Sequence, residues 1–213
     1  MKIKVNGQLK TIPERWEEVT FEQFIKLAEP GDQAKIISAI LEMPEPEIKG
    51  AKIEGLEKIL WHLKFLQKPF EIDKQPKKVG DYSFPEKIEF QTIEQYQEVL
   101  QEIQRVTSLT PSEQLEAIPF YAAVYVTDPY DSEKARFKAQ EFKKLPCTEV
   151  MAAGTFFMTK SLSLQSGLPM SYLSRHLPMK KNRLGFRTLV RRLASTKLWI
   201  VCQGMWDKMT RRS

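Results

Sequence analysis

The sequence predicts an α+β fold that is mainly α, in which small β-hairpins are each followed by a group of helices and a basic helical region ends the chain. Three observations predict it: turn signals before two similar stretches, capping residues ahead of apolar helical stripes, and an uneven distribution of charge. The chain has 213 residues and 42% hydrophobic content, which is enough to bury a substantial core.

Two short hairpins are predicted, one at the start of each half of this arrangement. Asn6-Gly7 lies between two short alternating runs and favours a type I′ turn, which needs positive φ at both central residues. A weaker signal, Gly80-Asp81, precedes Tyr82. Each hairpin is followed by a proline that cannot donate to a strand ladder, so we expect the strands to end before Pro13 and Pro85.

The stretch IPERWEEVTFEQF at 12–24 returns 72 positions later as FPEKIEFQTIEQY at 84–96, and six of the twelve positions from 13 to 24 are identical. This echo predicts a duplicated unit over 1–72 and 73–145. The other interpretation is chance recurrence of a capping box, because such boxes are common.

The residues shared by the two similar stretches predict helix starts. Thr20 is expected as the N-cap with Gln23 at the third helical position, which is a capping box. Thr92 and Gln95 repeat this spacing. A hydrophobic staple between residues 19 and 24 completes the first copy, whereas Gln91 removes the staple from the second.

Apolar periodicity predicts three helices after each start. In the first unit the expected ranges are 20–28, 33–43 and 53–67. In the second unit a helix follows Thr92 with one apolar face. Thr110 then caps a helix towards Val126 that Pro119 should kink or restart, and the run from 120 to 126 also fits a buried strand; a charged helix over 131–145 completes the unit.

The carboxyl-terminal region, 146–213, is predicted to be a basic helical docking region. The last 63 residues hold 12 basic residues and one acid, whereas the first 150 hold 21 basic residues and 26 acids. A helix is expected over 148–165, then a short one over 171–177, and an amphipathic helix from Lys180 with arginines at every fourth position.

This arginine pattern fits three kinds of partner: an acidic protein surface, including that of another copy, nucleic acid phosphate, or a membrane surface. A solvated helix face with its tryptophans in the core is the fourth interpretation. We rank protein docking first and nucleic acid second. The expected partner-binding residues are Arg183, Arg187, Arg191, Arg192, Trp199 and Trp206.

No enzyme activity, metal site or cofactor is expected from the sequence. His62 is expected to be a satisfied histidine at the edge of the core, and His176 has no Cys, His or Asp cluster nearby at metal-ligand spacing. Cys147 and Cys202 are expected to be packing residues in a reducing compartment. No secretory signal is evident at the amino terminus. The longest apolar-leaning stretch, 150–164, is too polar and short for a bilayer span, so no membrane span is expected.

The amino-terminal stretch resembles small proteins of tailed bacteriophages, namely tail-assembly chaperones and baseplate-hub assembly proteins. The matching positions cover about the first 30 residues and are Pro13, Trp16, Val19, Thr20, Gln23 and Phe24. The resemblance implies a non-enzymatic role in tail or neck assembly, as a structural component or a chaperone, in the virion or the host cytoplasm. Its partners would be other phage structural proteins. The alternative function is a nucleic-acid-binding virion protein that contacts the genome through the basic region.

Overall fold

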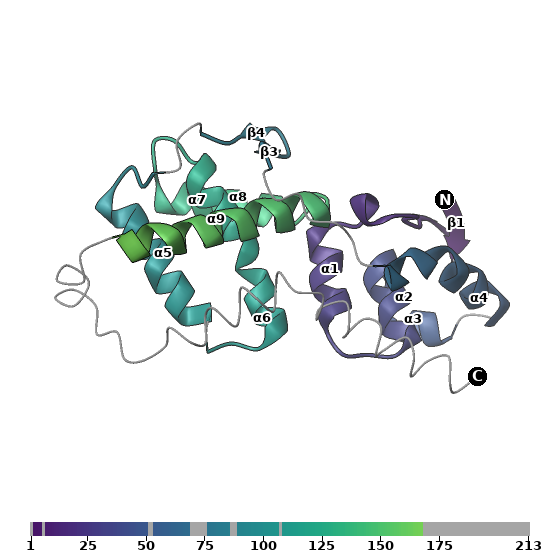
Figure 1. Ribbon diagram of the computed structural model, residues 1–213. Coiled ribbons are helices and arrows are strands. Elements are labelled where there is room, and N and C mark those ends of the chain that lie inside the picture. The colour runs from purple at the N-terminus through teal and green to yellow at the C-terminus, as the bar shows by residue number, and fades with distance from the viewer. Residues whose placement is uncertain are drawn as a thin grey trace.

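The computed structural model describes residues 2–5, 7–50, 53–68, 76–85, 89–106 and 108–167. In this part the fold is mainly helical, with two small antiparallel hairpins, as the sequence predicts. Figure 1 shows two groups of helices side by side, with the long helix α9 extending through the second group toward α1.

The first group begins with the predicted hairpin and continues with short helices. Strands β1 and β2 pair with Ile3 opposite Lys10, and Gly7 adopts φ +82 at the turn. Ile3 and Val5 lie on the half-buried face, which packs on the core. The elements are β1 (Lys2–Val5), β2 (Gln8–Thr11), η1 (Trp16–Glu18), α1 (Phe21–Ala28), α2 (Gln33–Leu41), α3 (Glu45–Lys49), α4 (Ile53–His62) and η2 (Leu63–Gln67).

The second group repeats the order of a hairpin followed by helices. Its turn contains Gly80 with φ +54, and its first helix starts at Ile93, which is 72 positions after the start of α1 at Phe21. Its elements are β3 (Lys78–Val79), β4 (Tyr82–Ser83), α5 (Ile93–Val106), α6 (Pro111–Glu116), α7 (Ile118–Val126), α8 (Ser132–Phe142) and α9 (Cys147–Gly167).

The helix predicted from Thr110 towards Val126, with a restart near Pro119, is confirmed: α6 ends at Glu116, and α7 begins at Ile118 with Pro119 in its first turn. Proline fits at this position because first-turn N–H groups have no helical partner. The alternative of a buried strand over 120–126 is wrong. The short helix α3 was not expected, because its sequence, Glu45–Lys49, contains a proline at 46 and is too brief to show a period.

One hydrophobic core includes both groups of helices and α9. Residues 118–125 of α7 are all buried, so this helix is covered on every side. The same buried cluster contains Val19 and Phe21 of the first group and Val150 and Phe157 of α9. The described part of α9 therefore belongs to the core of the molecule.

Candidate functional site

The predicted partner-binding residues lie outside the described part of the chain. These are Arg183, Arg187, Arg191, Arg192, Trp199 and Trp206. The predicted caps at Thr20, Gln23, Thr92 and Gln95 are all described.

The first capping box is present. Thr20 Oγ1 accepts a hydrogen bond from the Gln23 backbone N–H at 3.2 Å, and Gln23 Oε1 accepts one from the Thr20 N–H at 2.9 Å. Gln23 then extends beyond its own helix, because its Nε2 donates to the Ile40 carbonyl of α2 at 3.0 Å. Val19 and Phe24, the expected staple pair, are both buried. The motif thus fixes the start of α1 and ties it to the end of α2.

The first two N–H groups of α1 are bound by a segment far away in the sequence. Phe21 N–H donates to the Leu145 carbonyl at 2.9 Å, and Glu22 N–H donates to the Lys143 carbonyl at 2.8 Å. These carbonyls come just after the end of α8, so the positive end of α1 meets the negative end of α8. This contact joins the two groups of helices.

Trp16 packs at the same joint. Its Nε1 donates to the Lys68 carbonyl at 2.8 Å, and its ring makes edge contacts with Phe24 and Phe65. The Cys147 thiol donates to the Trp16 carbonyl at 3.4 Å. Burial raises the pKa of this thiol to about 12, so it stays protonated at neutral pH and acts as a packing residue.

In the second capping motif, the backbone N–H that donates to the glutamine side chain comes from one residue earlier than in the first. Thr92 Oγ1 accepts from the Gln95 N–H at 3.0 Å as expected, but Gln95 Oε1 accepts from the Gln91 N–H at 2.6 Å and the predicted bond to the Thr92 N–H is replaced. Gln95 is buried, and its Nε2 donates to the Val124 carbonyl of α7 at 3.1 Å. Its amide therefore links α5 to α7, much as Gln23 links α1 to α2.

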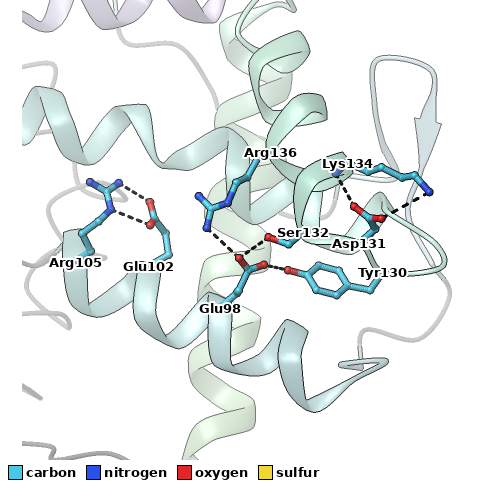
Figure 2. A network of polar contacts seen from close by, with 8 residues as sticks. All are labelled: Glu98, Glu102, Arg105, Tyr130, Asp131, Ser132, Lys134 and Arg136. Atoms are coloured by element: carbon cyan, nitrogen blue, oxygen red, sulfur yellow. Dashed lines mark hydrogen bonds and ion pairs between the residues drawn. The ribbon is translucent and has the colours of Figure 1, made fainter.

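A polar network centred on Glu98 of α5 holds the connection between α7 and α8, and the start of α8, against α5 (Figure 2). The Glu98 carboxylate accepts hydrogen bonds from the Tyr130 hydroxyl, from Ser132 Oγ at 2.6 Å and from Arg136 at 3.0 Å. Burial favours the neutral form of Glu98, but the hydrogen bonds from Ser132, Tyr130 and Arg136 outweigh it and hold its pKa below the ordinary value. Glu98 is thus an ionised acceptor that holds three side chains of one segment.

Two ion pairs flank this network in Figure 2. Arg105 forms two hydrogen bonds to Glu102, of 2.6 and 2.9 Å. Asp131 pairs with the Lys134 ammonium at 3.8 Å and also caps α8 by accepting from the Lys134 backbone N–H at 2.9 Å. Glu98 is not among the residues predicted from the sequence. The signal available was the spacing of Glu94, Glu98 and Glu102, which places three carboxylates on one side of α5.

Large hydrophobic side chains stand exposed at four places of the described chain. They are Leu9 at 67%, Trp61 at 62%, Ile93 at 66% and Phe137 at 66% of their full exposure. Trp61 and Phe137 lie on α4 and α8 among charged side chains. Exposed aromatic anchors with a polar surround are typical of protein-binding surfaces.

Neither metal ligands nor a membrane span stand out in the described part. No group of three or more His, Cys, Asp or Glu side chains there could hold a metal ion. His62 is half-buried and makes an edge contact with the ring of Trp61 at 5.0 Å. His176 lies outside the described residues. Among the helices described, none is long and apolar enough to cross a bilayer.

Comparison with known proteins gives no relative. A scan against protein-family models and searches of curated proteins and of solved structures each return no match.

Proposed function

We propose that the chain is a non-enzymatic bacteriophage protein that acts in tail or neck assembly through protein–protein contacts, as a structural component or a chaperone. The observation that carries the contact role is the pair of exposed aromatic anchors, Trp61 and Phe137, on helices held by a buried core. Large aromatic side chains supply much of the binding energy of protein interfaces. The phage assignment rests on the resemblance of the stretch from Pro13 to Phe24.

The proposed partners are other phage structural proteins, another copy of the chain or an acidic protein surface, bound through the basic region after residue 150. That region carries 12 basic residues and one acid, while the rest of the chain has more acids than bases. Opposite charges of this kind steer association and select partners.

The proposal is tested by reversing the arginine series in the full chain. We expect Arg183→Glu, Arg187→Glu and Arg191→Glu together to abolish particle assembly in a complementation assay while the melting temperature stays unchanged. The matched control reverses three exposed lysines elsewhere, Lys77, Lys78 and Lys144, with the same change of charge. Normal assembly by the arginine variant would reject docking through this region.

Mass spectrometry of purified particles and of assembly intermediates tests the phage role. A fixed copy number in finished particles identifies a structural component. Presence in intermediates alone identifies a chaperone. Absence from both would reject the assignment to tail or neck assembly.

The charge of the same region also favours a second function, nucleic-acid binding inside the virion. Lysine and arginine bind phosphates irrespective of sequence, and Trp199 and Trp206 are of the type that stacks on bases. Binding of this kind weakens steeply as salt rises. A titration with DNA at increasing salt tests it, and a lack of binding at low salt would reject it.

A further inference from the structure

Helix α4 presents an exposed tryptophan flanked by lysines. Trp61 is 62% exposed, Lys58 precedes it by three residues on α4, and Lys64 follows it by three in η2. The exposed Glu57 lies four positions before Trp61, so lysines outnumber acids around the indole by two to one. The Lys64 ammonium lies 5.5 Å from the centre of the indole ring, within the range of a cation–π contact. This set, Lys58, Trp61 and Lys64, is named the α4 face.

The α4 face is held in a fixed orientation by the opposite side of the same segment. Ile59, Leu63 and Leu66 are buried there, at 4%, 0% and 9% exposure. Trp61 itself is held against the His62 ring. A fixed apolar anchor loses little conformational entropy on binding, which suits it to an interface.

The lysines of the α4 face form no ion pair within the described chain, where the charge of Lys64 contacts the Trp61 ring. Among the ion pairs between described residues, none includes Lys58 or Lys64. An acidic partner would therefore find both lysines available.

An excess of acid lies on the neighbouring helices. Residues 12–50, which include α1, α2 and α3, contain nine acidic and four basic residues. Each of the four bases is already paired inside this stretch: Arg15 with Glu18, Lys26 with Glu22, Lys35 with Glu29, and Lys49 with Asp32 and Glu45. Most of the nine acids are exposed, and the stretch has five more acids than bases. Its exposed side is named the acidic α1–α3 surface.

We propose that the α4 face binds the acidic α1–α3 surface of a second copy of this chain. The two surfaces are complementary in charge, and the ion pairs above do not join them within one molecule. Since the two surfaces differ, the contact runs head to tail, and repetition adds copies in a ring or a row. The inference rests on the contact role proposed for Trp61 and names the partner bound there. Because self-association of the purified chain is measured without a phage particle, its failure is distinguishable from failure of the assembly role.

Sedimentation of the purified full chain over a concentration series tests the contact. We expect self-association at about 50 mM salt that weakens at about 500 mM, because salt screens exposed charges. Trp61→Ala with Lys64→Glu should weaken it by about tenfold or more, as loss of a central interface residue does. The matched control, Ile93→Ala with Lys144→Glu, removes an equally exposed hydrophobic side chain and the same charge from the second group of helices, and should leave self-association unchanged.

A second variant and a cross-linking measurement keep the proposal testable if loss of Trp61 disturbs folding. Lys58→Glu with Lys64→Glu keeps the indole and should also weaken association. Carbodiimide cross-linking of mixed light and heavy isotope-labelled chains should join Lys58 or Lys64 of one copy to carboxylates of 14–47 in the other. A monomer at both salt concentrations, equal effects of the α4-face variant and the control variant, or inter-copy links that exclude these lysines would each overturn the proposal.

Discussion

At the scale of single residues, Gln23 and Gln95 show what the repeated motif does. Each amide binds the backbone at the start of its own helix and donates to a carbonyl near the end of another helix, Ile40 or Val124. A shorter side chain could cap a helix but could not reach a second one. The repeated glutamine is therefore explained by packing between helices as well as by capping.

Glu42 stores backbone strain at the end of α2. Its φ of 51 lies in the left-handed region, where a side chain costs energy and glycine does not. We expect Glu42→Gly to stabilise the protein by about 1 kcal/mol, since the lost contact from Gln23 Nε2 is long, at 3.4 Å, and exposed. Urea unfolding measures the change. Glu42→Ala is the control, and an equal gain from it would contradict strain as the cause.

Glu98 makes stability depend on pH in a defined direction. Its pKa is lowered in the fold, so the native state binds its proton less readily than the unfolded chain. The stabilisation is present above the unfolded pKa of about 4.3 and is lost as pH falls through the folded pKa. We expect Glu98→Gln to cost about 1 kcal/mol near neutral pH, because it weakens three hydrogen bonds to a charged acceptor.

The measurement for Glu98 is the free energy of unfolding of both proteins from about pH 7 to about pH 3, a range that spans the titration of carboxylates. The difference between them should shrink as pH falls, because wild-type Glu98 then loses its charge. Glu18 and Glu113, whose pKa values are also lowered, affect both proteins alike. A difference that stays constant with pH would contradict the role assigned to Glu98.

At the scale of elements, the close packing of α7 and α9 depends on Gly154. A Cβ at this position would lie 2.4 Å from both the carbonyl oxygen and Cγ2 of Ile118. We expect Gly154→Ala to destabilise the protein by about 1–3 kcal/mol, because the backbone of Ile118 must move. Gly55→Ala in α4 is the control, since nothing lies within 4 Å of a Cβ there.

The control should behave in the opposite way. Alanine favours a helix over glycine by up to about 1 kcal/mol, so Gly55→Ala should stabilise the protein. Thermal unfolding of both variants distinguishes packing from helix propensity. If Gly154→Ala also raised the melting temperature, the close approach of α7 and α9 would be refuted.

Local sequence signals predicted where several helices and turns begin, but they did not predict the contacts between segments far apart in the chain. The turn at Gly7, the cap at Thr20 and the box at Thr110 each depend on a few adjacent residues, so the sequence reveals them. The bonds from Phe21 to Leu145 and from Ser132 to Glu98 join segments far apart in the chain. Neither periodicity nor capping rules carry information on such pairs.

At the scale of the whole molecule, the described part of α9 completes the core. The sequence predicts a helix over 148–165, and α9 lies there. Phe157 stacks on Tyr125 with ring centres 4.4 Å apart, and Ser161 hydrogen-bonds the Tyr125 hydroxyl at 2.8 Å. Tyr125 belongs to α7, the helix that is buried on every side. Removal of α9 would therefore expose α7 to water.

Truncation at two positions tests this role of α9. We expect a chain of residues 1–145 to lose its cooperative thermal transition and bind a hydrophobic dye, because the apolar residues of α7 lose their cover. A chain of residues 1–167 retains α9 and should unfold in one sharp transition. Near-ultraviolet circular dichroism, which reports fixed aromatic packing, would follow both. A sharp transition for 1–145 would show that the core closes without α9 and would place the boundary of the basic region at residue 146.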